Sequence, residues 1–371
     1  MRIGVPKETK DHEFRVGLTP AGVRELVQDG HEVVVERSAG HAIGLDDSLY
    51  EAAGARIVAN ASTLYDQCEL IIKVKEPNPE ECRLLHQGHT LFTYLHLAAA
   101  PQLTRALQDS GCTALAYETV TDAHGRLPLL APMSEVAGRM AIQAGAHSLE
   151  MVRGGRGVLL SGVPGVEPGQ VVVLGGGVVG SNAARIALGL GARVTLLDHS
   201  LPRLRELDER YGPQLNTLHA NREHIETALL QADLVVGAVL LPGASSPKLV
   251  DRDQVRAMKR GSVIVDVSID QGGCFATSRP TTHAEPTFIE EEVVHYCVTN
   301  MPGAVACTST FALTNATLPF VLELANKGVM GALAENRMLA AGMNLHRSQI
   351  THAALAESLG QSYVPVAQAM V

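Results

Sequence analysis

The part of the chain that most restricts its fold is residues 171–198, VVVLGGGVVGSNAARIALGLGARVTLLD. Val171–Leu174 is a short all-apolar run, typical of a parallel strand buried on both faces. A glycine-rich turn follows, then helical sequence from near Ser181, then a second β-rich run, Arg193–Leu197. This succession predicts a strand–turn–helix–strand unit, and therefore an α/β fold with a doubly wound parallel sheet.

The glycines of the turn, Gly175, Gly177 and Gly180, form a G-x-G-x-x-G pattern. In a dinucleotide-binding unit the first makes a tight turn, the second lets the backbone approach a pyrophosphate, and the third lets the helix lie against the strand. The amino end of the helix directs its unpaired N–H groups at the same phosphates. Asp198 follows at the distance where a carboxylate accepts the adenosine-ribose hydroxyls. The alternative is a tight turn between strand and helix that binds no ligand.

Asp198 also bears on which dinucleotide is bound. A carboxylate at this position repels a 2′-phosphate, which favours NAD over NADP. His199 and Arg203 lie close by in the sequence and weaken that preference. We predict NAD.

Composition excludes several classes of protein. The chain has 371 residues, 46% of them apolar and 19% charged, which suits two globular domains rather than a disordered protein. Its net charge of −9 and the absence of Trp do not suit a nucleic-acid surface. We see no signal peptide and no uninterrupted apolar run long enough for a membrane span.

The cysteines are scattered, and none forms a C-x-x-C pair or a zinc-type cluster with histidine. They suit small buried side chains in a reducing compartment, so we expect a cytoplasmic protein. They are Cys68, Cys82, Cys112, Cys274, Cys297 and Cys307.

The region before the glycine turn has an α/β rhythm of its own and no phosphate-binding pattern. Helical segments separate its β-rich runs, for example Thr19–Gln28, with Thr19 as N-cap and Pro20 as first helical residue. The expected strands are Arg2–Pro6, His31–Glu36, Leu70–Lys75, Thr90–Leu95 and Thr113–Glu118.

A long helix capped by Ser134 and running to about Val152 is expected to connect this region with the next. The glycine- and proline-rich segment Gly154–Gly169 is predicted to be a loop. Strands Leu234–Leu240, Ser262–Ile269 and His295–Thr299 would complete the second sheet. From Thr308 the pattern is helical to the end of the chain, and this tail is expected to fold back on the first domain or to contact another subunit.

Four residues near predicted strand ends are candidates for chemistry, because ligands of open α/β sheets lie beyond the carboxyl ends of the strands. Lys75 ends LIIKVK, His96 follows TLFTYL, and Asp270 follows SVIVDVSI, while Arg15 lies in a polar loop before a helix. A histidine suits proton transfer near neutral pH, and an arginine can bind a carboxylate with two hydrogen bonds. Each also has an ordinary structural alternative, and Asp266, within its strand, suits a structural role better than Asp270 does.

These residues with their flanks resemble the L-alanine dehydrogenase family. The resemblance starts at RIGVPKETKDHEFRVGLTP, continues through IIKVKEP, LFTYLHLA, APMSEVAGRMA and the glycine turn, and ends with VDVSIDQGG and TNMPGAV. It covers essentially the whole chain. The alpha subunit of the proton-translocating transhydrogenase is similar over the same region.

The resemblance implies NAD-dependent, reversible oxidative deamination of L-alanine to pyruvate and ammonia. It implies a Rossmann NAD-binding domain at 129–306 and a Rossmann-like substrate domain at 1–128 and 307–371, completed by the helical tail. Arg15 and Lys75 would bind the substrate, His96 would be the acid/base, and Asp270 would be a second catalytic residue. The positions matched to NAD binding are Ser134, Gly175, Gly177, Val178, Val179, Gly180, Asp198, Arg203, Val239, Leu240, Val267, Ser268, Ile269, Asp270, Arg279, Val298, Thr299, Asn300 and Met301.

The chain departs from the family pattern at two places. Ala220 replaces a serine common in the family. Glu323 and Lys327 stand where some members have a glutamate and a histidine that bind a metal, and we expect no such metal here because a lysine does not replace that ligand. The resemblance also implies a small-molecule substrate and a homohexamer, with no nucleic-acid or membrane partner. The alternatives are a transhydrogenase-like NAD(H)-binding subunit and a non-catalytic NAD-binding protein.

Overall fold

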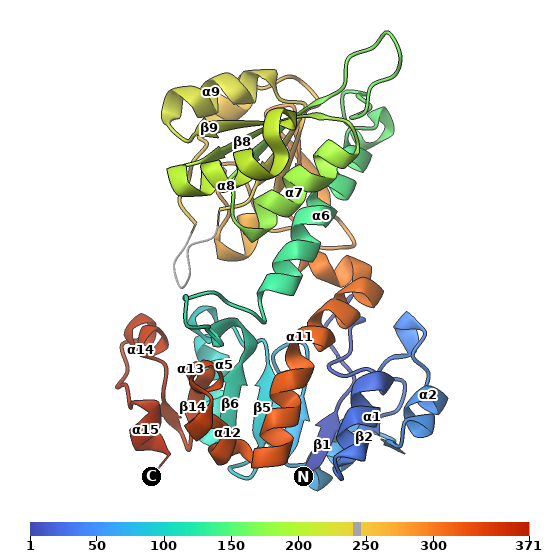
Figure 1. Cartoon of the computed structure of the whole chain (residues 1–371), viewed down its shortest axis with the longest axis vertical. Coiled ribbons are helices and arrows are strands. Elements are labelled where there is room, and N and C mark those ends of the chain that lie inside the picture. The colour runs from blue at the N-terminus through green and yellow to red at the C-terminus, as the bar shows by residue number, and fades with distance from the viewer. Residues whose placement is uncertain (240–245, 371) are drawn as a thin grey trace. The chain divides into compact units, whose positions relative to one another are not determined.

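The computed structural model describes residues 1–239 and 246–370. Contacts between residues divide the chain into two compact units. The first unit consists of Met1–Met133 and Val305–Val371, and the second of Ser134–Ala304. Each has a sheet of its own with helices on both faces (Figure 1), as the two-domain α/β prediction requires. The predicted NAD-binding domain, 129–306, is a few residues longer than the second unit at both ends.

The first unit contains an eight-stranded sheet in the order β3-β2-β1-β4-β5-β6-β14-β15. Strands β3 to β6 are parallel and follow the 3-2-1-4-5-6 order of a Rossmann fold, whereas β14 and β15 are antiparallel. The strands are β1 (Arg2–Val5), β2 (Glu32–Glu36), β3 (Arg56–Val58), β4 (Leu70–Ile72), β5 (Thr90–Thr93), β6 (Thr113–Ala116), β14 (Met343–His346) and β15 (Gln349–Ile350).

Helices cover both faces of this sheet. One face packs its apolar side chains against α3, α4, α5 and α14, while α1 and α11 lie side by side elsewhere in the unit (Figure 1). As predicted, Thr19 caps α1 and Pro20 is its first residue. The helices are α1 (Pro20–Gln28), α2 (Asp47–Ala52), α3 (Ala61–Gln67), α4 (Pro79–Leu84), α5 (Pro101–Ser110), α11 (Ala306–Lys327), α12 (Val329–Glu335), α13 (Arg337–Ala341), α14 (Ala353–Leu359) and α15 (Val366–Ala369).

The C-terminal tail is not wholly helical, so that prediction is wrong for residues 343–350. Strands β14 and β15 form a hairpin through Arg347 and Ser348, and both turn residues have positive φ, 44° and 67°. Such two-residue turns normally use Asn or Gly, so Arg-Ser gives no hairpin signal in the sequence. The tail therefore extends the first sheet beyond β6, as well as adding helices.

The stretch Met301–Lys327, within the part of the chain that the structure describes, is long and apolar enough to cross a membrane by length and composition alone. It includes α11, whose Leu313, Val321 and Leu324 are fully buried within the first unit. The helix also packs against α1 and α12. The core of the unit thus buries part of this apolar sequence, 39% of its most apolar window.

The second unit contains a seven-stranded sheet in the order β9-β8-β7-β10-β11-β13-β12. The first six are parallel in the 3-2-1-4-5-6 order, and β12 is an antiparallel edge strand. This is the predicted doubly wound sheet. The strands are β7 (Gln170–Leu174), β8 (Arg193–Asp198), β9 (Leu215–His219), β10 (Leu234–Gly237), β11 (Val263–Asp266), β12 (Thr287–Glu290) and β13 (Val293–Tyr296).

Helices α9 and α10 bury apolar side chains on one face of the second sheet. Glycines bring α6 close to its neighbours, since an added Cβ at Gly138 would overlap the carbonyl oxygen of Val179 in α7, and one at Gly145 would lie 2.5 Å from Leu234 Cδ1 in β10. The helices are α6 (Ala131–Ser148), α7 (Val178–Gly189), α8 (Leu201–Tyr211), α9 (Arg222–Gln231) and α10 (Arg252–Arg256).

Two predicted helix starts are wrong by three to four residues. Helix α7 begins at Val178, with Gly177 as its N-cap, rather than near Ser181. Helix α6 begins at Ala131, so Ser134 lies inside its first turn and is not the cap. In α7 the N-cap is Gly177 of the turn, so the turn leads directly into the helix and its backbone N–H groups lie at the helix start.

Candidate active site

In the first unit, charged side chains follow neighbouring parallel strands at one edge of the sheet. Lys75 lies three residues after β4, His96 three residues after β5, and Glu118 two residues after β6. These strands are adjacent and parallel, so their carboxyl ends meet at the same edge. Arg15 lies on the segment that follows β1, which is the neighbour of β4. The structure therefore brings together the three residues that the sequence predicted for this unit, and adds Glu118.

Arg15 is buried, with 2% of its surface exposed, and is held by Glu13. Its Nε and Nη2 donate to the two carboxylate oxygens of Glu13 at 2.7 and 2.6 Å. Burial opposes the charge, but the Glu13 carboxylate outweighs it and raises the pKa of Arg15 above its ordinary value. The guanidinium is thus a rigid, permanent cation in this unit. Its predicted role in binding a substrate carboxylate stays a prediction.

Lys75 is half-buried and lies beyond the strand end rather than at it, because β4 ends at Ile72. Glu8 accepts the backbone N–H groups of Val74 and Lys75 at 2.6 and 3.3 Å. Glu8 in turn faces the buried ammonium of Lys73, at 3.3 Å from Oε2. Burial raises the pKa of Glu8 despite that ammonium. A buried ion pair therefore fixes the backbone that carries Lys75.

His96 lies three residues beyond the end of β5 at Thr93, with its side chain 49% exposed. Its backbone is left-handed, with φ 49° and ψ 41°. The ring stacks parallel to that of Tyr94, with 6.0 Å between centroids. Burial raises the pKa of Tyr94, whose hydroxyl donates to the Leu129 carbonyl at 2.6 Å, and Arg15 opposes that rise. An accessible imidazole beside a neutral phenol suits proton exchange with a ligand.

In the second unit, the three glycines of the turn differ in backbone conformation and in the space around them. Gly175 has φ 99°, a conformation that favours glycine. An added Cβ at Gly180 would overlap the carbonyl oxygen of Gly175, so helix and strand approach too closely for a side chain. At Gly177 an added Cβ would have no atom within 4 Å. The protein's own atoms therefore do not require glycine there, and the open space is where the prediction places the pyrophosphate.

Asp198, the last residue of β8, is hydrogen-bonded to the same glycine turn. Its carboxylate accepts the backbone N–H groups of Gly176 at 2.6 Å and Ser200 at 2.7 Å. Arg203 donates from Nε to the Gly176 carbonyl at 2.6 Å. The predicted ribose-binding acid and its neighbour are thus both in contact with the glycine turn.

Val239 and Ser268 connect the ends of three neighbouring strands. An added Cβ at Gly175 would lie 3.1 Å from Val239 Cγ2, and Ser268 Oγ donates to the Val239 carbonyl at 2.7 Å. The ends of β7, β10 and β11 thus meet here, as the crevice of an open α/β sheet requires. Leu240, predicted beside Val239, lies outside the described residues.

Asp270 is not at a strand tip, which corrects the prediction. Strand β11 ends at Asp266, and Val267–Gln271 form a 3₁₀ helix that carries Val267, Ser268, Ile269 and Asp270. Asp270 is exposed on this helix. Asp266 is fully buried and accepts the backbone N–H groups of Ser268 and Cys274 at 3.1 and 2.9 Å, which is the structural role predicted for it.

The remaining predicted cofactor positions are the segment after β13, Arg279 beside that segment, and Ser134 in α6. Thr281 forms an isolated parallel bridge with Val298, so the segment that holds Arg279 runs beside Val298 and Thr299. The Arg279 guanidinium lies 4.0 Å above the ring of Phe288. Asn300 has φ 61°, and Met301 is buried at the start of a short 3₁₀ helix. Ser134 is half-buried in the first turn of α6.

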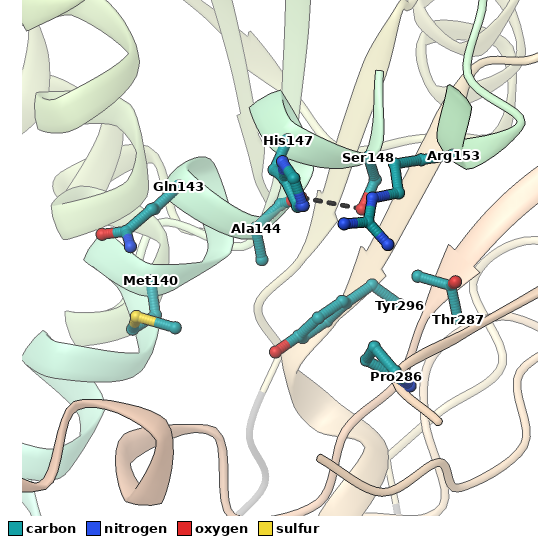
Figure 2. Close-up of a pocket in the computed structure, with 9 residues that line it drawn as sticks. All are labelled: Met140, Gln143, Ala144, His147, Ser148, Arg153, Pro286, Thr287 and Tyr296. Carbon is teal, nitrogen blue, oxygen red and sulfur yellow. Dashed lines mark hydrogen bonds between the residues drawn. The ribbon is translucent and has the colours of Figure 1, made fainter. Parts of the chain in front are cut away.

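A hollow of about 260 Å³ lies elsewhere in the second unit, between α6 and the β12–β13 edge (Figure 2). Met140 and Tyr296 are among its apolar walls, and His147 and Arg153 are at its rim. None of the predicted substrate or cofactor residues lines it. His147 faces Glu150, with 3.1 Å between Nδ1 and Oε1. The hollow is therefore distinct from the glycine turn.

At the departure from the family pattern in α11, Lys327 is placed between two carboxylates. Its Nζ lies 2.9 Å from Glu323 and 2.8 Å from Glu335, which raises the pKa of Lys327 to about 12. Over the described residues there is no group of three or more His, Cys, Asp or Glu side chains that could hold a metal ion. The absence of a metal in the protein stays a prediction.

Sequence reasoning missed Glu8, Glu13 and Glu118, the carboxylates that hold Lys75, Arg15 and His96 in place. Glu118 had a usable signal, since it is the last residue of the predicted strand Thr113–Glu118, as Lys75 is of the predicted strand Leu70–Lys75. Glu13 lies two residues from Arg15, but this spacing alone does not indicate an ion pair. Glu8 acts over a long sequence separation, which a single sequence does not show.

Two family models match the chain: "Alanine dehydrogenase/PNT, N-terminal domain" over residues 4–137 and "Alanine dehydrogenase/PNT, C-terminal domain" over residues 141–353. The chain is 60% identical over 367 residues to an alanine dehydrogenase of Halomonas elongata, with 99% of each chain covered. It is 54% identical to one of Bacillus subtilis, covering 100% of this chain and 98% of that one. It is 51% identical to one of Mycobacterium tuberculosis, with both chains fully covered.

Solved structures agree with the sequence matches. An L-alanine dehydrogenase superposes with a TM-score of 0.94 at 51% identity, covering 97% of this chain and 99% of that one. A transhydrogenase of Sinorhizobium meliloti superposes with a TM-score of 0.82 at 22% identity, covering 95% and 100%, which shows a shared fold. Both family models and the full-length relatives lead to one conclusion: this chain belongs to the alanine dehydrogenase/PNT family.

Proposed function

We propose that the protein catalyses the NAD-dependent, reversible oxidative deamination of L-alanine to pyruvate and ammonia. The observation that carries the proposal is the edge of the first sheet, where Lys75 and His96 follow adjacent parallel strands. The chain also shares 51–60% identity over its whole length with several alanine dehydrogenases. A cation and a proton-exchanging group side by side suit chemistry at a carbonyl or amine next to a carboxylate.

NAD is the proposed cofactor, and when bound it would accept hydride from Cα of the substrate or return hydride in the reverse direction. The open space at Gly177 and the N–H groups at the start of α7 fit its pyrophosphate. Asp198 is proposed to accept the ribose hydroxyls, and the other predicted cofactor positions are proposed to line the crevice at the ends of β7, β10 and β11.

For the substrate, Arg15 and Lys75 are proposed to bind the carboxylate and the carbonyl oxygen. Their positive charge stabilises negative charge that develops on oxygen during water or ammonia addition. His96 takes a proton from the attacking water or amine and returns it when the leaving group departs. Asp270 is proposed as a second catalytic residue, since it is exposed on the 3₁₀ helix that follows β11.

We further propose that the protein is a cytoplasmic homo-oligomer, a hexamer by its resemblance to the family. Met151 and Val152 are 77% and 87% exposed, and further exposed apolar side chains follow at Leu159, Val163 and Val166. Apolar surface of this kind supports association between copies. The free cysteines among the described residues support a reducing compartment. Size-exclusion chromatography with light scattering measures the oligomeric state.

The second candidate is a transhydrogenase-like NAD(H)-binding subunit, which the shared fold with the Sinorhizobium protein suggests. The identity of 22% supports it far less than 51% supports the dehydrogenase. The deciding experiment follows NADH absorbance in purified protein with NAD at alkaline pH. A rise with L-alanine, and none with D-alanine or L-glutamate, is the expected result. A flat trace with all three, from protein that still binds NADH, would reject the proposed reaction and leave the cofactor assignment.

A further inference from the structure

Glu118 lies on the 3₁₀ helix Tyr117–Thr119 that follows β6. Its carboxylate accepts the backbone N–H of His96 at 2.6 Å and that of Leu95 at 3.2 and 3.3 Å. Both N–H groups lie beyond the end of β5 at Thr93, where the ladder of the sheet no longer supplies acceptors. The Glu118 side chain is 15% exposed, so these hydrogen bonds are largely shielded from water.

The backbone at His96 needs such a restraint. Its φ of 49° and ψ of 41° lie in the left-handed region, which is uncommon for residues other than glycine, although histidine is found there more often than most. Such a conformation persists where the surroundings impose it, and it is frequent at functional sites. The hydrogen bond from the His96 N–H to Glu118 is a contact to the strained residue itself. It therefore determines the direction in which the imidazole leaves the chain.

The same carboxylate faces the ring. Oε1 of Glu118 lies 4.0 Å from Nδ1 of His96, the ring nitrogen that is nearer to the backbone. At this distance the contact is electrostatic rather than a hydrogen bond, and it favours the tautomer with the proton on the nearer nitrogen. The second nitrogen, Nε2, then carries the lone pair that accepts a proton.

The other titratable groups around this pair come from the segment after β5 and from the C-terminal tail. Tyr94 stacks on the His96 ring, and burial raises the pKa of its phenol, so that it stays neutral. His352, at the start of α14, interacts electrostatically with Glu118, while burial lowers the pKa of His352. Glu118 thus interacts electrostatically with both histidines.

The C-terminal tail holds Glu118 in place. Asn344 of β14 donates from Nδ2 to Thr119 Oγ1 at 2.7 Å and so fixes the residue that follows Glu118. Helix α14 packs against the 3₁₀ helix Leu97–Ala99, which begins directly after His96. Strands β5 and β6 and the tail thus converge on the one backbone position from which the imidazole projects.

We propose that Glu118 is the positioning residue of His96, holding its backbone in the left-handed turn and its ring with the proton on Nδ1, so that Nε2 exchanges the proton with the substrate. The proposal rests on the proposed function in that it takes His96 as the acid/base. Glu118 itself touches neither substrate nor cofactor in this scheme. Its effect passes through His96 alone.

The test compares Glu118→Gln and Glu118→Ala in the full-length protein. Glutamine keeps an oxygen acceptor for the N–H groups and loses the charge, whereas alanine loses both. We expect Glu118→Ala to lower kcat about 10- to 100-fold and Glu118→Gln to retain more than about a tenth of it, with the KM for NADH unchanged in both. A carboxylate in the same unit that also accepts a backbone N–H, Glu36 with Lys7 at 2.8 Å, provides the control variant Glu36→Gln.

The second readout does not depend on turnover. Nitrogen-15 NMR of histidine-labelled protein at alkaline pH reports which ring nitrogen carries the proton, and the spectrum of His96→Gln identifies the His96 signals. We expect the Nδ1–H form in the wild type and in Glu36→Gln, and a shift toward the Nε2–H form in Glu118→Ala. Unchanged tautomer and a kcat within about twofold of wild type in Glu118→Ala would overturn the proposal.

If Glu118→Ala does not fold, Glu118→Gln decides the question on the same two readouts, and wild-type values in both would overturn the proposal. Failure of the proposed function is distinguishable, because it appears as wild-type protein that does not reduce NAD with L-alanine. The tautomer comparison still tests the placement of His96 in that case.

Discussion

The first and second units contain parallel sheets of the same 3-2-1-4-5-6 strand order, and they differ in the groups that they place beyond the carboxyl ends of the strands. In the second unit the turn after β7 offers backbone N–H groups and open space at Gly177. In the first unit the ends of β4, β5 and β6 carry Lys75, His96 and Glu118. One sheet thus presents its backbone to a ligand, and the other presents charged side chains.

The difference shows how one fold supports two kinds of recognition. A backbone site needs glycine, because a Cβ would occupy the space of the ligand or of the helix. A side-chain site needs fixed rotamers, and here buried carboxylates such as Glu8 and Glu13 supply the restraint. The proposed site of the second unit therefore depends on glycines, which have no side chain. The proposed site of the first unit depends on charged side chains that buried carboxylates hold in place. Substitutions in the two units test each side of this comparison.

The largest effect is expected at His96. His96→Ala should lower kcat about 10²- to 10⁴-fold, because a positioned acid/base is lost. The Kd for NADH, measured by its fluorescence, should stay within about twofold, because the proposed cofactor site is in the second unit. His41→Ala, which changes an exposed histidine of the first unit, serves as control. Activity within about tenfold of wild type would show that His96 is not the acid/base.

The glycine turn allows two substitutions with opposite outcomes. Gly177→Ala should leave stability nearly unchanged and raise the Kd for NADH about 10- to 100-fold, since the new methyl group enters ligand space alone. Gly180→Ala should lower the free energy of unfolding by about 1–3 kcal/mol, because its methyl group meets the Gly175 carbonyl. Urea unfolding and NADH titration of both variants separate the effects. Equal loss of stability in the two would contradict the geometric distinction.

A smaller change is expected from Asp198→Asn. The amide oxygen keeps an acceptor for the Gly176 N–H, while the charge that repels a 2′-phosphate is lost. The ratio of the NADPH Kd to the NADH Kd should fall about tenfold, with most of the change in NADPH. Glu206→Gln, which removes a carboxylate paired with Arg203, is the matched control. An unchanged ratio in Asp198→Asn would mean that Asp198 does not select the cofactor.

The same contrast explains what the sequence could predict. The second unit was predictable because the glycines stand at fixed spacing between a strand and a helix, and the structure gives Gly175 and Gly180 separate backbone and steric reasons. Helix starts were less predictable, since Ser181 has the side chain of an N-cap whereas Gly177 performs the capping through its backbone. Ser134 misled in the same way within α6.

In the first unit the sequence indicated only which residues follow the strands, and not their partners. Lys75 and His96 could be identified as candidates by their place after apolar runs, but their partners Glu8 and Glu118 join them only through the fold. The β14–β15 hairpin was missed because Arg347 and Ser348 are not residues typical of its turn. Asp270 was placed at a strand tip because the apolar run continues past Asp266 into a 3₁₀ helix.

The smallest expected effect is a pH dependence of stability that arises from two aspartates that accept backbone N–H groups, one fully buried and one only half-buried. Burial raises the pKa of Asp266 in the second unit above its ordinary 3.8, although hydrogen bonds from Ser278 and the backbone oppose the rise. Asp122 in the first unit is only half-buried, and the N–H groups of Arg126 and His124 lower its pKa. The two carboxylates have similar donors and differ in solvation.

Opposite pH dependences of stability follow from these directions. Folded protein binds the Asp266 proton more tightly than unfolded protein does, so the contribution of Asp266 is greatest below pH 3.8 and is lost as pH rises through its folded-state pKa. The contribution of Asp122 is present above pH 3.8 and is lost as pH falls through its lowered pKa. Relative to Asp266→Asn, wild-type protein should therefore lose stability as pH rises, whereas relative to Asp122→Asn it should gain. Urea unfolding midpoints of the three proteins across the acidic range measure both slopes. Slopes of the same sign would show that hydrogen bonding to the backbone, rather than burial, determines the ionisation of Asp266.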